Sequence, residues 1–181
     1  MSVSIRIAKD TDVHELVPLA ARTFPLACPP EMDNSAIENF VHHELNAGVF
    51  AEWIANDQVY VLVATDGAML VGYTVCINDT LPVDADIDRE LPTEGAVMMS
   101  KFYVHPDFHG AGVSKNMMAH LMEHYITSER HWMWLGTNQA NARAITFYER
   151  NGFQQVGTRT FDVGGTQAKD VVLARRLPSL G

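Results

Sequence analysis

The sequence predicts a mixed α/β (α+β) fold, in which a twisted, mostly antiparallel sheet of about seven strands carries helices on both faces. Two observations lead to this prediction. Segments with strand-like and helix-like spacing of apolar side chains follow one another in the order βααββ–βαβα–ββ, and Asp66-Gly67 and Gly164-Gly165 predict two tight hairpin turns. The chain has 181 residues, a length that suits one domain, residues 1–181, around one core.

The first elements are a strand and a helix that proline interrupts. Residues 3–7 alternate between apolar and polar side chains and predict a strand. A helix follows, capped by Asp10 or Asp12. Pro18 predicts a kink or an early end in this helix, because proline has no amide to donate. Residues 23–30 contain three prolines and are expected to form a loop.

A second helix and a hairpin come next. Ser35 and Glu38 predict a capping box, in which each side chain satisfies a free amide at the start of the helix. A further short helix is expected over residues 50–54. Two strands, 58–64 and 69–78, then flank the first hairpin turn.

The second half of the chain predicts alternating strands and helices. Residues 79–95 are acidic and aperiodic, and they are expected to form a solvated loop. The elements expected after this loop are a strand over 97–105, a long helix that opens at Gly112, a strand over 132–137, a short helix over 142–150 that Gly152 ends, and a hairpin over 153–177.

Composition narrows the class of partner and the compartment. The net charge of −9 argues against nucleic acid or an anionic membrane surface as the main partner, and it is compatible with a cationic substrate. Cys28 and Cys76 are too few for a disulfide framework or a cysteine-based zinc site. No apolar run approaches the ~18 residues of a membrane span, and the N-terminus lacks a signal-peptide stretch, so a cytoplasmic protein is expected.

A glycine-containing turn between a strand and a helix is the first chemical motif. It reads His109-Gly110-Ala111-Gly112-Val113-Ser114. Amides at the start of a helix point the same way and meet the positive end of its dipole, so such a turn suits a pyrophosphate. Gly110 and Gly112 with Lys115 do not supply the GxxxxGK(S/T) of a Walker loop, and Lys115 stands where a dinucleotide fingerprint would need its third glycine, so both alternatives fail.

The second motif is residues 141–153, NARAITFYERNGF, which alone predict only an amphipathic helix with a glycine cap. Together the two segments resemble the GNAT superfamily of acyl-CoA N-acyltransferases, with its (Q/R)xxGx(G/A) pyrophosphate loop and NxxAxxFYExxGF helix. His109 stands where Gln or Arg is usual, and Ser114 where Gly or Ala is usual. We therefore expect weakened rather than lost affinity for coenzyme A. The C-terminal half looks most like bacterial polyamine (spermidine/spermine-like) N-acetyltransferases.

The resemblance implies a GNAT-like fold, acetyl-CoA as co-substrate, no metal, a small-molecule amine as acceptor and a possible homodimer. It also implies that Tyr148 protonates the departing thiolate, which a phenol of pKa ~10 can do for a thiol of pKa ~8.5. The implied cofactor contacts are backbone groups of Phe102, Tyr103 and Val104 on the pantetheine arm, His109, Gly110, Ala111, Gly112, Val113 and Ser114 on the pyrophosphate, and Asn138, Asn141 and Ala144 beside the pantetheine.

The attacking amine needs a base, because an alkylammonium of pKa ~10.4 is only about 0.04% neutral at pH 7. Related enzymes often place a glutamate on the strand before the phosphate loop, and residues 97–101 contain no carboxylate. Glu94, just upstream, and Ser100, acting through ordered water, are the candidates for this role. Phe24 and Phe161 are candidates for contact with the acceptor.

Two alternatives remain open. The missing strand carboxylate also fits a non-catalytic acyl-CoA-binding sensor module. His120, Glu123 and His124 match the HxxEH pattern of inverted zinc peptidases, with Glu149 as a conceivable third ligand.

Overall fold

The protein is described by a computed structural model that covers residues 2–180. The strands are β1 (Val3–Ile7), β2 (Val59–Asp66), β3 (Met69–Asn78), β4 (Asp86–Ile87), β5 (Ala96–Val104), β6 (Trp132–Asn138), β7 (Gln154–Val163) and β8 (Thr166–Arg176). The helices are α1 (Val13–Ala27), α2 (Asn34–Glu44), α3 (Ala47–Ala55), α4 (Val113–Ile126) and α5 (Ala142–Arg150), with 3₁₀ turns at Asp10–Asp12 and Pro106–Phe108.

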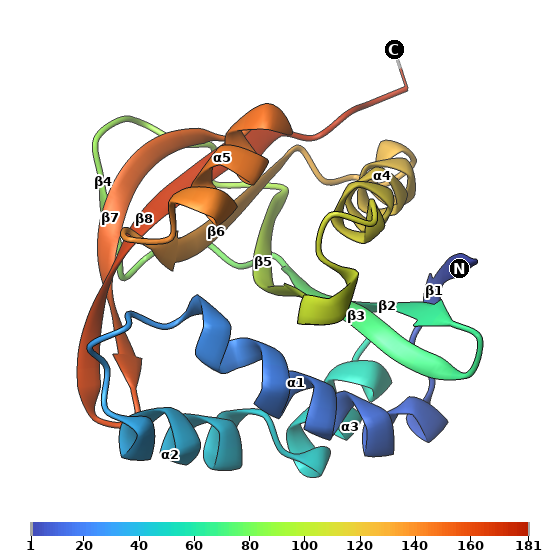
Figure 1. The fold of residues 1–181 in the computed structure, drawn as a ribbon. Helices are drawn as coiled ribbons and strands as arrows, with labels where there is room; N and C mark the ends of the chain where they lie inside the picture. Colours follow the sequence, from blue (N-terminus) through green and yellow to red (C-terminus); the bar gives the residue numbers. More distant parts are fainter. Residues whose placement is uncertain (1, 181) are drawn as a thin grey trace.

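The strands form one sheet of eight in the order β1-β2-β3-β5-β6-β8-β7-β4. Every neighbouring pair is antiparallel except β5 and β6, which run parallel. Figure 1 shows α1, α2 and α3 on one face of this sheet and α4 and α5 on the other. The mixed, mostly antiparallel fold predicted from the sequence is confirmed. The additional strand is β4, a two-residue strand inside the expected 79–95 loop that pairs with β7.

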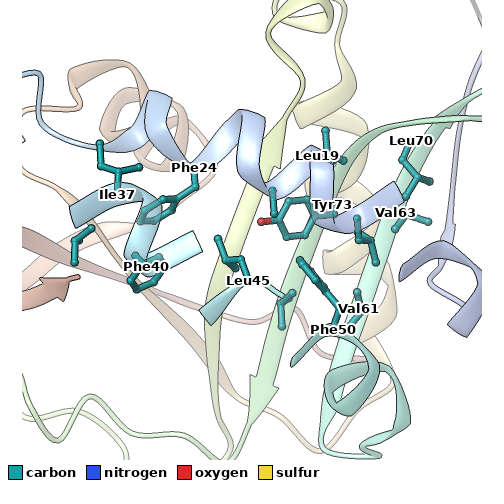
Figure 2. Close-up of a cluster of buried hydrophobic side chains, with 14 of the residues drawn as sticks. Leu19, Phe24, Ile37, Phe40, Leu45, Phe50, Val61, Val63, Leu70 and Tyr73 are labelled. Atoms are coloured by element: carbon teal, nitrogen blue, oxygen red, sulfur yellow. The ribbon is translucent and has the colours of Figure 1, made fainter. Parts of the chain in front are cut away.

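Apolar side chains attach α1 and α3 to β2 and β3, and α2 to α1 and β7. Figure 2 shows Leu19 and Phe24 of α1 on the same side of the sheet as Val63 and Tyr73. The Phe24 ring also stacks on Phe40 of α2 at a centroid distance of 4.4 Å. Full burial of an apolar side chain of this size contributes about 1.5–3 kcal/mol. The C-terminal end of α1 is therefore held firmly against the sheet.

Helix α1 corrects two expectations. It continues through Pro18 and Pro25 to Ala27, so residues 23–27 are helical and only the rest of the expected 23–30 loop is irregular. Its buried face runs at helical spacing from Leu16 past Pro18 to Phe24, and Pro18 lies on the exposed face, where the carbonyl left without a donor can be solvated. Packing of the buried face thus outweighs the lost hydrogen bonds.

The predicted start of α2 is also wrong. The cap lies two residues before Ser35, at Asp33, because the Asp33 carboxylate accepts a hydrogen bond from the amide of Ser35, and the helix begins at Asn34. Aspartate caps a helix as well as serine does. The short helix expected over 50–54 is confirmed as part of α3.

The later elements follow the prediction closely. β5, α4, β6 and α5 agree with the expected segments within a few residues, and β7 and β8 form the C-terminal hairpin. The hairpin turn packs on α2, where a Cβ added to Gly164 would lie 2.1 Å from the carbonyl oxygen of Ala36. In residues 2–180, no helix combines the length and the apolar character that crossing a membrane requires.

Candidate active site

The sheet opens between β5 and β6. The two strands pair only from Ala96 to Met98 and from Trp132 to Trp134, after which β5 stays with β3 and β6 stays with β8. Beyond these pairs, each strand keeps a row of backbone N–H and C=O groups without a strand partner on the side of the opening. Such groups can bind an extended ligand that carries amides of its own.

A β-bulge at Ser100 shapes this opening. Val75 pairs with Lys101 and Cys76 pairs with Met99, so Ser100 is an extra residue in β5. The bulge shifts the alternation of side chains along β5. As a result, the side chains of Lys101 and Tyr103 face α1 to α3. Bulges are frequent beside active sites because they redirect a side chain in this way.

The opening leads into a cleft of about 540 Å³ that passes through the sheet. We call the side with α4 and α5 the cofactor half and the side with α1 to α3 the acceptor half. The sequence-predicted residues that line the cleft are Phe24, Ser100, Phe102, Tyr103, Val104, His109, Ser114, Asn138, Asn141, Ala144, Tyr148 and Phe161.

The predicted residues Gly110 to Val113 lie in the turn beside the cleft, between His109 and Ser114, and do not line it themselves, whereas Glu94 lies outside the cleft altogether. It belongs to the loop before β5, its side chain is exposed, and its backbone carbonyl accepts a hydrogen bond from the indole of Trp132. A carboxylate in that position faces water rather than the opening between the strands.

The turn before α4 has free amides and open space above its backbone. Gly110 and Gly112 adopt left-handed conformations, with φ of 80° and 81°, and a Cβ at either position would meet no atom within 4 Å. The amides of His109 and Ala111 bond within the turn, to the carbonyls of Pro106 and Phe108. The amides of Gly110, Gly112, Val113 and Ser114 have no backbone acceptor within residues 2–180, which leaves them available to an anion.

His109 ties this turn to its surroundings. Its Nε2 lies 2.8 Å from the carbonyl oxygen of Val104, and its Nδ1 lies 2.8 Å from Nη1 of Arg143. A carbonyl can only accept and a guanidinium can only donate, so Nε2 carries the proton and Nδ1 is the acceptor. His109, one of the two departures from the motif that the sequence resembles, therefore holds the turn, and it also directs Arg143 to the cleft.

The two asparagines use their side-chain oxygens within the fold. The Asn138 oxygen accepts the amide of Ala140 at 2.8 Å, and the Asn141 oxygen caps α5 by accepting the amide of Ala144 at 3.2 Å. Only their NH₂ groups remain for a ligand in the cleft. Ala144, half-buried, lines the wall between them and Tyr148.

Tyr148 occupies the cofactor half. Its ring packs edge-on against Phe102, Phe147 and Phe153 at centroid distances of 6.2, 5.4 and 5.7 Å. Among the described residues, the only fully buried side-chain polar atom without a partner is the hydroxyl of Tyr73, so the unbonded Tyr148 hydroxyl is accessible from the cleft. Burial raises the pKa of Tyr148, which keeps the phenol protonated at neutral pH.

The acceptor half has an aromatic wall and a group of charged side chains. The aromatic residues were predicted from the sequence, and the charged ones were not. Phe24 and Phe161 both pack against Phe40 and belong to the buried cluster under α1 and α2, and both also line the cleft. The charged groups in this half are Lys101 of β5, Arg159 of β7 and Asp170 of β8. Arg159 and Asp170 are cross-strand partners, and the Arg159 Nε lies 3.2 Å from the Asp170 carboxylate. Only the sheet register, which pairs β7 with β8, brings these charges together.

Both cysteines carry protonated thiols. Cys28 lines the acceptor half, and burial, together with the nearby charge of Asp170, raises its pKa to about 11. Burial raises the pKa of Cys76 to about 12. Because a thiolate is the nucleophilic form, neither thiol is prepared to accept an acyl group.

The HxxEH segment does not form a metal site in the part of the chain that the structure describes. Residues 2–180 contain no group of three His, Cys, Asp or Glu side chains that could hold one metal ion. His124 instead stacks on Tyr60, with ring centroids 3.7 Å apart and planes 2° from parallel.

Comparison with known proteins places this geometry in context. The family model described as "Acetyltransferase (GNAT) family" matches residues 14–153. Proteins of Mycobacterium bovis and Mycobacterium tuberculosis, both named as uncharacterized N-acetyltransferases, are 37% identical over 171 residues, which cover 92% of this chain and 99% of theirs.

Solved structures share the fold at low sequence identity. The PaiA N-acetyltransferase from Thermoplasma acidophilum, in complex with coenzyme A, superposes with a TM-score of 0.77 at 15% identity, over 97% of this chain and 99% of that one. The structure of yncA from Salmonella typhimurium, with its cofactor acetyl-CoA, has a TM-score of 0.70 at 17% identity, over 100% and 97% of the two chains.

Proposed function

Because the chain belongs to the acetyltransferase (GNAT) family, we propose that its cleft binds acetyl-CoA and that it transfers the acetyl group to a primary amine of a small molecule. Family membership makes the protein an N-acetyltransferase. The proposal concerns the co-substrate, the acceptor and the residues that act. One observation carries it: the cleft between the two diverging strands is lined by the phenol of Tyr148 and by Ser114, which stands beside the free amides at the start of α4.

The cofactor half fits coenzyme A in two respects. The free amides of Gly110, Gly112, Val113 and Ser114 suit a diphosphate, and Arg143 adds a positive charge beside them. The backbone groups of β5 over residues 102–104 that have no partner suit the amides of a pantetheine arm, although the Val104 carbonyl already accepts from His109. The free NH₂ groups of Asn138 and Asn141 suit the same arm. Bound acetyl-CoA would supply the activated acetyl thioester.

Tyr148 donates the proton that the departing thiolate needs. Its hydroxyl has no competing acceptor among the described residues, and its raised pKa keeps the proton in place until sulfur becomes basic. The protonated thiols of Cys28 and Cys76 support direct attack by the amine rather than an acyl-cysteine intermediate.

Asp170 replaces Glu94 as the candidate base. It is the carboxylate that lines the cleft in the described part of the chain. One of its oxygens accepts from Arg159, and the other has no donor and is accessible. Burial raises its pKa, which makes it a better proton acceptor than an ordinary aspartate. Ser100 accepts a hydrogen bond from Lys101 at 3.0 Å, so its role is at most that of a relay through water.

The role of Asp170 can be tested by pH dependence. If Asp170 is the base, kcat/KM falls on the acid side as it is protonated, and this acid limb disappears in Asp170→Asn together with most of the activity. An Asp170→Asn variant that loses activity equally at every pH would assign Asp170 to structure alone.

The proposed function is tested by measuring thiol release from acetyl-CoA across a panel of primary amines, together with calorimetric titration of coenzyme A. We expect binding and amine-dependent release. Arg143→Gln should weaken coenzyme A binding about tenfold, as expected for a charge-assisted hydrogen bond. The matched control is Arg150→Gln, at the exposed end of the same helix, which should bind normally. Tight binding without release for any amine would favour the non-catalytic sensor, and no binding would reject both.

The panel should include polyamines. A polyamine-like acceptor is the hypothesis that the subgroup resemblance suggested, and the net charge of −9 is compatible with it. The charges inside the acceptor half, however, do not favour a polycation, because two cationic side chains there face one carboxylate.

A further inference from the structure

The acceptor half of the cleft carries more positive than negative charge, although the protein as a whole is acidic. Its charged lining consists of Lys101, Arg159 and Asp170. Because the Asp170 carboxylate pairs with the Arg159 guanidinium, the charge of Lys101 is left uncompensated. Buried charges are normally paired, so an unpaired one in a cleft calls for a ligand of opposite charge.

Arg159 is held rigidly with part of its guanidinium free. The side chain is only 8% exposed, and its Nε bonds to Asp170. It lies over the backbone of Gly136, where a Cβ would come within 2.5 Å of Nε, so only glycine leaves room for it. It also contacts the rings of Trp134 and Phe161 at 5.6 and 5.2 Å. The two terminal nitrogens have no acceptor among residues 2–180 and are not buried, so they are accessible from the cleft.

Lys101 is the second cation, and it has no carboxylate partner in the described residues. Its ammonium donates to the backbone carbonyl and the hydroxyl of Ser100, at 3.2 and 3.0 Å, which leaves one N–H free. It lies 5.7 Å from the Trp53 ring. Burial, together with the charge of Arg159, lowers the pKa of Lys101 to about 8, whereas the charge of Glu44 of α2 opposes the shift. Lys101 and Arg159 thus line the same cleft with like charges.

We propose that the acceptor is an amine that also carries a carboxylate, and that Lys101 and Arg159 bind this carboxylate in the acceptor half of the cleft. This inference rests on the proposed function and names its substrate class. The planar, two-nitrogen edge of a guanidinium matches a carboxylate, and the free ammonium N–H supplies a second contact. The ligand's negative charge would relieve the repulsion between the two cations.

Asp170 fits the other end of such an acceptor. Its accessible oxygen opens on the same half of the cleft and attracts the ammonium group. The acceptor half thus presents one anion and two cations, which complements an amino acid or a similar zwitterion. The aromatic wall of Phe24, Phe161 and Tyr103 suits an apolar remainder.

The test compares acceptors that differ only in the carboxylate. Thiol release from acetyl-CoA is measured with the L-amino acids and with their carboxamides, and with spermidine as a polycation. For the acceptors that react, we expect kcat/KM to be at least tenfold higher for the acid than for its carboxamide, and spermidine to be poor. Lys101→Met should remove at least tenfold of kcat/KM for the acid and change the carboxamide less than threefold. The matched control, Lys169→Met on the exposed face of β8, should change neither.

A binding measurement keeps the inference separate from catalysis. With coenzyme A present, N-acetyl-L-phenylalanine and its carboxamide are titrated calorimetrically into the wild-type protein, where we expect at least tenfold tighter binding of the acid. Equal binding of the two, or better turnover of the carboxamides or of spermidine, would overturn the inference and leave the N-acetyltransferase function intact. Failure of every amine to release thiol would reject the proposed function, and the titration would still decide whether the acceptor half binds carboxylates.

Discussion

Replacing Tyr148 by phenylalanine tests the chemistry of the cofactor half with little disturbance of the fold. The ring packs against three aromatic rings, which phenylalanine keeps, and the hydroxyl makes no hydrogen bond within the described residues. Because no protein hydrogen bond is lost, the free energy of unfolding should change by less than about 1 kcal/mol. The effect of the substitution is therefore expected in catalysis.

The magnitude follows from the proton that Tyr148 would supply. General acid catalysis contributes ~10²–10⁴-fold in rate, and a thiol of pKa ~8.5 is a leaving group that can also depart without a proton. We therefore expect Tyr148→Phe to lower kcat by about one to three orders of magnitude, or roughly 1.4–4.1 kcal/mol of barrier at 1.36 kcal/mol per decade. The loss should be similar between pH 6 and 9, since burial raises the pKa of the phenol above this range.

Thiol release from acetyl-CoA in the presence of a good acceptor is the assay, and calorimetric titration of acetyl-CoA is the control for binding. The variant should bind acetyl-CoA with nearly the affinity of the wild type. Turnover at the wild-type rate in a variant that binds normally would refute the acid role of Tyr148. A loss of turnover that is matched by a loss of binding would reassign the hydroxyl to binding.

Three further predictions concern the turn before α4, stability in acid and the buried lysine. Gly112→Ala places a Cβ in open space but strains a left-handed backbone by ~1–2 kcal/mol. Calorimetry should therefore show coenzyme A binding about tenfold more weakly to this variant. The control is Gly67→Ala, which is also left-handed and open but lies in a distant hairpin turn, and this variant should bind coenzyme A normally. Asp12 accepts two hydrogen bonds from Arg6, at 2.8 and 2.9 Å, which lower its pKa, so Asp12→Asn should cost about 1.5–3 kcal/mol in urea unfolding at pH 7. The difference in unfolding free energy between the wild type and Asp12→Asn should disappear as the pH falls through ~3.9, the pKa of an aspartate in the unfolded state, and below. A difference that persists in acid would contradict this account of Asp12. The folded-state pKa of Lys101, about 8, lies below its unfolded value, so the unfolded state binds more protons between about pH 8 and 10, and the stability of the wild type relative to Lys101→Met should rise over that range.

The sequence predicted the order of elements well because local signals marked most of them. Alternation defined the strands, and the pairs Asp66-Gly67 and Gly164-Gly165 marked the two hairpins. The errors came where tertiary packing outweighed local signals. The prolines predicted a loop over residues 23–30, but Thr23 and Phe24 belong to the buried face of α1, and the helix continues to Ala27. The two-residue strand β4 carries no pattern of its own and exists only because β7 lies beside it.

Most residues of the cofactor half could be predicted from the sequence, whereas the charged residues of the acceptor half could not. The turn at residues 109–114 and the segment 141–153 are short motifs, so their residues adjoin one another in the sequence. Arg159 and Asp170 lie on different strands and become neighbours through the register of β7 and β8. The bulge at Ser100, which turns Lys101 towards α1 to α3, has no glycine or other local marker. The sequence therefore suggested a general base near β5, the strand before the turn at residues 109–114, and this led to Glu94, which is exposed and lies outside the cleft.

The separation of β5 from β6 also bears on the order of events in a catalytic cycle. Side chains from opposite faces of the sheet line the two halves of the cleft. A ligand bound in one half therefore leaves the other half open to a second ligand. Both reactants can then be present at once, and the acetyl group need not rest on the protein while one of them leaves. Initial rates should accordingly give intersecting double-reciprocal lines rather than the parallel ones of a substituted-enzyme mechanism.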